Sequence, residues 1–281
     1  MQAELSEALG QEVEAWEFFR QGQIGAMYKA TVAGKEYVVK TSTQADKLAI
    51  EARMLHDLDD AKIRVPQVIL SQGDFLVIEH IKRVPKDSAA QESEAATLVA
   101  SLHTVTNENR MYGYYYDTTI GPFGQKNEQT QYNWTLFLGQ MRIMPMARRC
   151  YDGGRISKQI LERLEGLCRD LYKRIDMSTI YPSLLHGDIW SGNVLFEKQG
   201  ACLIDPAIYY GDKEMELAFI LLFDTFGETF FDRYSAVHPL SEDFYETKVP
   251  LYQLYPVLVH VALYGGSYAG QLEQLLQRLK V

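Results

Sequence analysis

Apolar and polar positions alternate in different ways in two successive parts of the chain. Near the beginning, period-two alternation predominates and favours β-strands, and intervals of three and four residues over 45–58 favour one helix. Gly10 and the pair Ala33-Gly34 are typical of a helix end and a tight turn. The predicted elements are a helix over 1–10, strands around 16–18, 28–32 and 37–40, the helix over 45–58, and strands around 65–69 and 75–78.

After Ile81 the composition changes. The polar segment Lys82–Ser88 contains Pro85 and is typical of a linker. Stripes of apolar residues at helical spacing then predict helices around 95–102, 134–141, 160–171, 217–223 and 257–263, with Pro145 expected to end or kink the second. We therefore expect an α+β fold of two lobes: an N-lobe over 1–81, built from a small antiparallel sheet with one helix, and a larger, mainly helical C-lobe over 82–281.

The strongest chemical signal is the segment HGDIWSGNVLFEKQGACLIDPA, residues 186–207. Asp188 and Asn193 are five residues apart, and Asp205 follows a predicted hairpin of strands 194–196 and 201–204 that should bring all three together. Phosphoryl transfer needs this set, with Asp188 as the base for an acceptor hydroxyl and with Asn193 and Asp205 offering oxygen ligands to Mg²⁺. His-Gly-Asp and Asp-Pro-Ala, in place of His-Arg-Asp and Asp-Phe-Gly, argue against a protein kinase.

The strand-rich part contains candidates for binding ATP. Lys40 ends a predicted strand and Glu51 lies in the next helix, which is the arrangement of the lysine–glutamate pair that holds ATP phosphates in kinases. The turn from Gly22 to Gly25 offers two glycines for a phosphate loop but matches the G-x-G-x-x-G pattern poorly.

The last strand of this part, residues 75–81, precedes the linker. By its order along the chain, we expect the backbone around Glu79 and Ile81 to contact adenine.

The composition limits the partners and the cellular compartment that we expect for this protein. The 281 residues are 47% hydrophobic with a net charge of −9 and no basic stripe, so nucleic acid is not an expected partner. Three cysteines without metal-like spacing indicate free thiols in a reducing compartment. Apolar runs are too short to cross a bilayer, and no signal-type segment is evident. We expect a cytoplasmic protein without a membrane partner, and we expect a monomer because nothing in the sequence demands a dimer.

The strings HGDIWSGN and IDPAIYYGDKEMELAFILLF, with the segment 120–145, resemble the fructosamine kinase (ketosamine 3-kinase) family, a branch of the aminoglycoside phosphotransferase-like kinase fold. The resemblance implies ATP-dependent phosphorylation of the 3-hydroxyl of a ketoamine, either small or carried on a protein, as a deglycation reaction. It also implies that Trp190 lines the sugar pocket, since a flat indole packs well on sugar C–H groups. Either Glu214 or Glu216 would brace the catalytic loop.

One segment departs from the family pattern. GQIGAM lacks the paired glycines and the cysteine that some members carry in this loop. Two other functions stay open. The same catalytic core occurs in kinases of aminoglycosides, choline and other amino alcohols.

The second alternative rests on the loop, because a degraded glycine loop is compatible with an ATP-binding pseudokinase. The 120–145 segment favours the ketoamine, and the presence of all the catalytic residue types favours an active enzyme.

Overall fold

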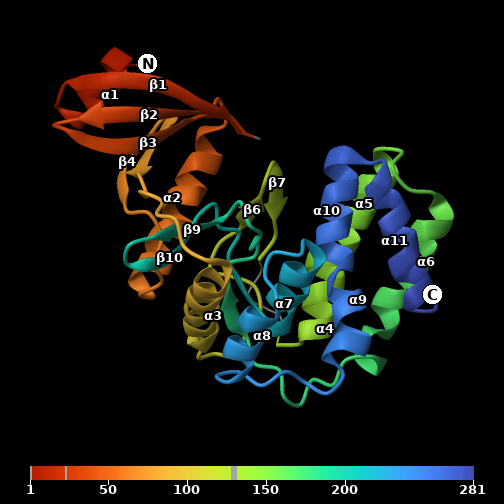
Figure 1. The fold of residues 1–281 in the computed structure, drawn as a ribbon. Helices are drawn as coiled ribbons and strands as arrows, with labels where there is room; N and C mark the ends of the chain where they lie inside the picture. Colours follow the sequence, from red (N-terminus) through yellow and green to blue (C-terminus); the bar gives the residue numbers. More distant parts are fainter. Residues whose placement is uncertain (1, 23, 128–131) are drawn as a thin grey trace.

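The computed structural model describes residues 2–22, 24–127 and 132–281, so Met1 of the predicted first helix and Gln23 of the glycine loop lie outside the described residues. The chain forms a sheet part and a helical part, set side by side in Figure 1. The elements of the sheet part (residues 2–79) are α1 (Gln2–Leu9), β1 (Val13–Gln21), β2 (Ala26–Val32), β3 (Lys35–Thr41), α2 (Ala45–Asp60), β4 (Val68–Gln72) and β5 (Phe75–Glu79).

The five strands form one antiparallel sheet in the order β1-β2-β3-β5-β4. The predicted turn at Ala33-Gly34 joins β2 to β3, and both residues have positive φ, 49° and 70°, as a two-residue hairpin turn with the twist of the strands requires. Helix α2 packs its apolar stripe, including the buried Leu48, Leu55 and Leu58, into the main core. The predicted strand around 65–69 begins only at Val68.

The helical part begins after the linker. Its elements are α3 (Ser88–Thr104), β6 (Thr118–Ile120), β7 (Phe123–Gln125), α4 (Trp134–Phe137), the π-helical η1 (Leu138–Ile143), α5 (Met144–Asp152), α6 (Lys158–Asp170), the 3-10 turn η2 (Leu171–Lys173), β8 (Ser183–Leu185), β9 (Val194–Glu197), β10 (Gly200–Leu203), β11 (Tyr209–Gly211), α7 (Lys213–Leu222), α8 (Glu228–Ser235), the π-helical η3 (Phe244–Lys248), α9 (Val249–Tyr252), α10 (Leu254–Tyr264) and α11 (Ser267–Arg278).

The predicted helix around 134–141 does not end at Pro145. Helical backbone continues from α4 through η1 into α5, where Pro145 occupies the first turn. Because helical turns precede Pro145, its missing N–H removes a hydrogen bond that a continuous helical segment would otherwise make. The wider π-helical turn just before it takes up the change in backbone hydrogen bonding.

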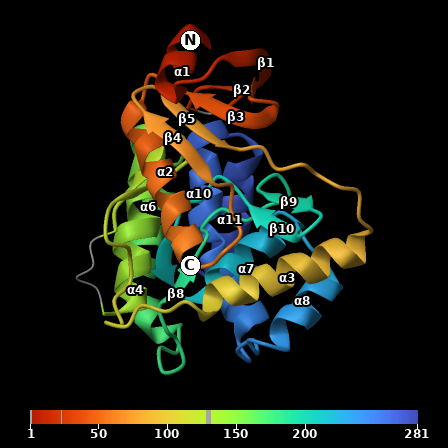
Figure 2. The ribbon, with the colours of Figure 1, turned by 90° about the vertical axis from the view of Figure 1, so that its left-hand side faces the viewer.

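The hairpin β9–β10 lies where the two parts meet. It packs on α3 (Figure 2), and its Leu203 amide donates to the Arg64 carbonyl oxygen at 3.0 Å. The Arg64 side chain also bridges Glu79 at the end of β5 and Glu197 at the end of β9, with N–O distances of 2.9 and 2.6 Å. The segment predicted to carry the catalytic groups is therefore attached directly to the sheet part.

A second attachment fixes helix α2. The hydroxyls of Tyr114 and Tyr116, in the segment before β6, donate to Asp57 Oδ2 at 3.1 and 2.6 Å. The Arg53 guanidinium, also on α2, lies 3.7 Å from the centroid of the Tyr116 ring. We call Arg53, Asp57, Tyr114 and Tyr116 the tyrosine latch. It holds the helix of the sheet part against the helical part.

Within the described residues, no helix combines the length and the apolar character needed to cross a membrane.

Candidate active site

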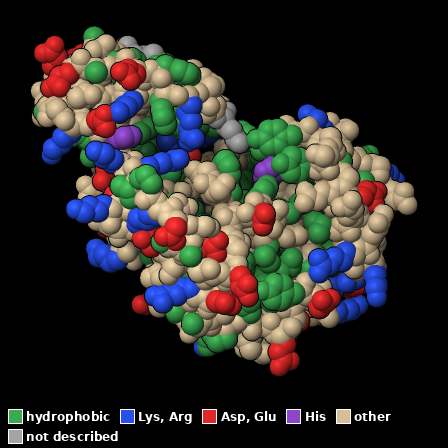
Figure 3. Space-filling model, in the orientation of Figure 1, with side chains coloured by type: hydrophobic (Ala, Val, Ile, Leu, Met, Phe, Trp, Pro, Cys, Tyr) green, Lys and Arg blue, Asp and Glu red, His purple; other side chains and the backbone are tan. Residues whose placement is uncertain are grey.

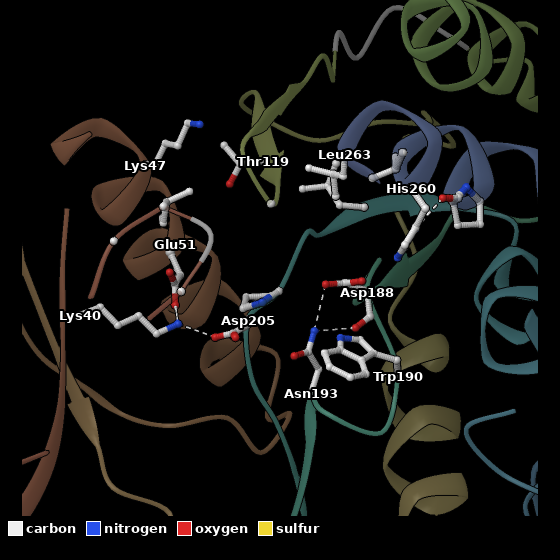
Figure 4. A pocket seen from close by; sticks show the side chains of 18 of the residues that line it. Lys40, Lys47, Glu51, Thr119, Asp188, Trp190, Asn193, Asp205, His260 and Leu263 are labelled. Carbon is white, nitrogen blue, oxygen red and sulfur yellow. Dashed lines mark hydrogen bonds and ion pairs between the residues drawn. The ribbon is translucent and has the colours of Figure 1, made fainter. Parts of the chain in front are cut away.

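A cavity of about 700 Å³ lies between the sheet part and the helical part. Figure 3 shows the hollow between them on one face of the molecule. Its lining includes most of the predicted site residues: Gly22, Gly25, Lys40, Glu51, Asp188, Trp190, Asn193 and Asp205. Figure 4 shows Lys40, Glu51 and Asp205 on one side of this cavity and Asp188, Trp190 and Asn193 on the other.

The loop from His186 to Asn193 is shaped by a glycine and a buried carboxylate. Gly187 has φ +84°, and a Cβ there would lie 2.3 Å from the Ala207 carbonyl oxygen, so only glycine fits. Glu216 of α7 accepts hydrogen bonds from the amides of His186 and Gly187 at 3.0 and 2.6 Å, and its Oε2 also lies 3.0 Å from His103 Nε2. Glu216 therefore braces the loop.

Glu214, the other candidate brace, faces elsewhere. Its carboxylate accepts from the Ser241 amide at 2.6 Å and from Lys248 Nζ at 2.5 Å, within a buried network that also contains Asp212. The sequence left the choice between Glu214 and Glu216 open, because both lie in the first turn of one helix.

Asp188 and Asn193 form the pair predicted from their spacing. Asn193 Nδ2 donates to both the carbonyl oxygen and the carboxylate of Asp188, each at 2.9 Å. Burial, and after it the negative charge of Asp205, raises the pKa of Asp188 to about 7. A carboxylate with a pKa near neutrality is well matched to taking up a proton.

Asp205 lies at the end of β10 with φ +54°, a left-handed conformation uncommon outside glycine. Its carboxylate forms an ion pair with Lys40, which also pairs with Glu51 of α2. Burial alone would raise the pKa of Asp205, but the Lys40 ammonium holds it below its usual value. Lys40, Glu51 and Asp205 thus form one charged cluster in which Lys40 and Glu51 are buried and Asp205 is partly exposed. Dashed lines mark its two ion pairs in Figure 4.

The residues present fit a hard divalent cation. Both amide hydrogens of Asn193 face Asp188, so its side-chain oxygen lies on the side of Asp205 (Figure 4). Among the described residues, no group of three His, Cys, Asp or Glu is spaced to hold a metal alone. One carboxylate and one amide oxygen, completed by phosphate and water, are the kind of ligand set that Mg²⁺ uses in phosphotransfer sites.

Trp190 lies beside Asp188 on the cavity wall. Its side chain is 44% exposed although it is a tryptophan, so the ring is available to a ligand. A Cβ on Gly192 would lie 2.3 Å from this ring. The missing side chain at Gly192 is therefore what allows the indole to lie across the loop.

Gly22 and Gly25, which flank the predicted glycine loop, lie close together. The Gly22 amide donates to the Gly25 carbonyl oxygen at 2.7 Å, and a Cβ on Gly25 would lie 1.7 Å from the Thr41 carbonyl oxygen. Gly25 is thus needed for close packing of the loop on β3. Gln23 of this loop is outside the described residues.

Glu79 and Ile81, the predicted adenine contacts, are not among the described residues that line the cavity. The Glu79 amide donates to the Gln67 carbonyl oxygen at 2.9 Å, and its carboxylate binds Arg64. Ile81 is buried in a small apolar cluster with Leu195 and Cys202 of the β9–β10 hairpin. Any contact of adenine with the Glu79 amide would therefore have to displace an existing bond.

The far wall of the cavity is aromatic, and sequence reasoning missed it. The His260 ring lies 4.9 Å from Phe223 and 4.8 Å from Tyr268, centroid to centroid. Phe223 and His260 belong to helical stripes that the periodicity assigned to plain core, and Tyr268 lies outside every predicted stripe. Only the packing of α7, α10 and α11 at one end of the cavity shows that they border it.

Comparison with known proteins shows which family the chain resembles. The family model described as fructosamine kinase matches residues 1–281. A probable ketoamine kinase of Enterococcus faecium is 32% identical over 91% of this chain and 92% of its own, and one of Escherichia coli K12 is 30% identical over 98% and 96%.

Solved structures extend the likeness. A Thermobifida fusca protein assigned as a fructosamine-3-kinase superimposes with a TM-score of 0.86 at 29% identity, covering 100% of this chain and 99% of its own. An aminoglycoside phosphotransferase solved with ADP and hygromycin B has a TM-score of 0.71 at 15% identity, over 99% and 98% of the two chains, and shows the shared kinase-like α+β fold alone. From its full-length family match, we conclude that the chain belongs to the fructosamine kinase family.

Proposed function

We propose that this protein phosphorylates a sugar hydroxyl of ketoamines at the expense of ATP, as a deglycation enzyme. The observation that carries the proposal is the division of the cavity into two chemical sides, with the Lys40–Glu51–Asp205 cluster facing Asp188, Asn193 and Trp190. Family membership supports the ketoamine as acceptor. The nucleotides bound to the aminoglycoside phosphotransferases of this fold support ATP as donor.

We propose that Lys40 and the loop of Gly22 and Gly25 bind the phosphates of the nucleotide. Glu51 would hold the Lys40 side chain in the orientation that this contact needs. The base would lie toward Glu79 and Ile81. The N-lobe of residues 1–81 would be the nucleotide-binding unit, and 82–281 the catalytic and acceptor-binding unit. Mg²⁺, held by Asn193 and Asp205, would neutralise phosphate charge that the protein's own cations leave uncompensated.

For the acceptor, we assign Trp190 to packing on the sugar and Asp188 to the reacting hydroxyl. As the hydroxyl oxygen forms its bond to the γ-phosphorus, the bond to the bridging oxygen breaks and ADP leaves. The hydroxyl proton passes to the Asp188 carboxylate. Asn193 holds that carboxylate in place through the 2.9 Å hydrogen bond, so positioning rather than covalent help provides the rate enhancement.

We also propose a cellular compartment and an oligomeric state for the protein. Cys150, Cys168 and Cys202 are free thiols, two of them buried, which supports a reducing compartment and hence the cytoplasm. We expect the protein to act as a monomer.

The test measures ATP consumption with Mg²⁺ on a panel of fructoselysine, ribuloselysine, an aminoglycoside and choline. Asp188→Asn keeps the shape and the Asn193 contact and serves as the control. Turnover on a ketoamine that the substitution abolishes is the expected result. Turnover confined to another acceptor would reject the ketoamine, ATP binding without turnover on any acceptor would favour a pseudokinase, and full activity of the Asp188→Asn protein would reject Asp188 as base.

A further inference from the structure

Arg20 stands immediately before the glycine loop on β1, and an irregularity in the strand decides which way it faces. The β1–β2 pairing is regular from Ala15 to Phe18, which lies opposite Tyr28, and then shifts by one residue, so that Arg20 lies opposite Met27. A bulge of this kind turns the following side chain to the other face of the sheet. Without it, Arg20 would share a face with Phe18.

The shift places Arg20 in a row with the phosphate lysine. Met27, its partner on β2, lies opposite Lys40 on β3, and directly opposed residues project from the same face. Arg20 Nε also lies 3.2 Å from Met27 Sδ, which directs the arginine side chain along this row. Arg20 and Lys40 both line the cavity.

Both cations of the row reach the same carboxylate. Arg20 Nη2 lies 3.7 Å from Asp205 Oδ2, and Lys40 pairs with Asp205 Oδ1. The Arg20 side chain is 46% exposed, in contrast to the buried Lys40. An exposed ion pair at this distance is weak, so the guanidinium can exchange Asp205 for a stronger anion.

The composition of the glycine loop explains why a second cation would be needed to bind phosphates. In many nucleotide sites, backbone amides of a glycine-rich loop bind the phosphates. Here the Gly22 amide is already bonded to the Gly25 carbonyl oxygen, and the third glycine of the pattern is absent. A guanidinium has five N–H donors in a planar fork that matches phosphate oxygens.

We propose that Arg20 is a phosphate-binding residue that supplements this reduced glycine loop and clamps the nucleotide's polyphosphate from the β1 side of the cleft. The proposal rests on the use of ATP in the proposed function. It gives the departure of the loop from the family pattern a physical meaning, because the Gly22 amide is already hydrogen-bonded and the Arg20 side chain adds donors beside the loop.

The experiment measures equilibrium binding of ATP, ADP and adenosine to the full chain by calorimetry, with unsubstituted protein, Arg20→Ala and Arg20→Lys. A charge-assisted hydrogen bond to phosphate corresponds to roughly a 10- to 100-fold change in affinity. We expect Arg20→Ala to weaken ATP and ADP by that factor and to leave adenosine within twofold. Arg20→Lys should fall between, because it keeps the charge but loses the fork. Lys35→Ala, which removes an exposed cation of the same sheet beside the Ala33-Gly34 turn, is the matched control and should bind all three ligands normally.

Two results would overturn the proposal: ATP affinity of Arg20→Ala within twofold of the unsubstituted protein, or an equal loss for adenosine, which would indicate general damage to the loop. If the unsubstituted protein binds ATP but phosphorylates no ketoamine, the proposed function fails while the binding ratio still decides the role of Arg20. Failure of the unsubstituted protein to bind ATP would reject both.

Discussion

The Asp188 carboxylate should destabilise the free protein, and Asp188→Asn should reveal this as a pH-dependent gain in stability. Its native pKa of about 7 exceeds its ordinary value of 3.8. Below about pH 4 the carboxyl is protonated whether the chain is folded or not. Between about pH 4 and 7 the unfolded chain loses the proton first, so stability falls as pH rises, and above pH 7 the whole cost is present. Asparagine cannot ionise and escapes this cost.

The size of the effect follows from the same pKa. From pH 5 to the native pKa of about 7, each pH unit contributes about 1.36 kcal/mol, or about 2.7 kcal/mol in all. The Asp188 side chain is only partly buried at the cavity wall, so we take about half of this to allow for solvent screening. The stability gained by Asp188→Asn should thus be about 1.3 kcal/mol larger at pH 8 than at pH 5.

The assay is urea unfolding of both proteins at pH 5 and pH 8, without metal or nucleotide. Taking the difference between the two pH values cancels effects of the amide that do not depend on protonation. Asp232→Asn, at an exposed position of α8, is the control and should show no such difference. A gain that is equal at both pH values, or smaller at pH 8, would show that the folded protein does not disfavour the ionised carboxylate.

Three further substitutions test the site and its supports. Glu216→Gln should lower the free energy of unfolding by about 3 kcal/mol, because a buried carboxylate with several partners is lost, and should reduce kcat roughly 10- to 100-fold by displacing the loop. Gly192→Ala should push the Trp190 ring aside and raise the acceptor KM roughly tenfold while the ATP KM stays unchanged. Tyr116→Phe should cost about 1.5 kcal/mol in urea unfolding by removing its 2.6 Å hydrogen bond to Asp57.

Each of these has a result that would contradict it. Full kcat in Glu216→Gln would mean that the loop keeps its shape without the carboxylate. A rise in the ATP KM of Gly192→Ala equal to that for the acceptor would separate Trp190 from the acceptor side. Unchanged stability of Tyr116→Phe would show that the tyrosine latch contributes nothing measurable to the fold.

The sequence predicted structural elements correctly where the pattern that identifies them lies within a short segment. Alternation predicted the sheet strands because it reflects burial of one face of each strand. The turn residues between 196 and 201 located the β9–β10 hairpin because they favour a local reversal of the backbone. The strands β8 (Ser183–Leu185) and β11 (Tyr209–Gly211) escaped prediction, since each has three residues buried throughout and offers no alternation. Motif spacing also predicted that Lys40 would pair with Glu51, and the two contact each other. The ion pair of Lys40 with Asp205 was not predicted.

What could not be predicted depends on packing between distant segments. Glu214 and Glu216 are two positions apart on α7 and therefore point about 200° away from each other around the helix axis. Only the neighbours of that helix reveal that Glu216 faces the catalytic loop. The orientation of Arg20 depends on one irregular residue in the β1–β2 pairing, which no apolar pattern announces.

The tyrosine latch has a consequence for control of the enzyme. Because Asp57 on α2 is held by Tyr114 and Tyr116 of the helical part, the same helix keeps Glu51 beside Lys40 when no nucleotide is bound. Kinases that are regulated through this helix depend on its freedom to move away. Here Tyr114 and Tyr116 hold the helix in its working position, so a switch that moves this helix would first have to break the tyrosine latch. The output of an enzyme held in this way would follow the amount of protein and the amount of substrate present, which would suit the proposed deglycation role.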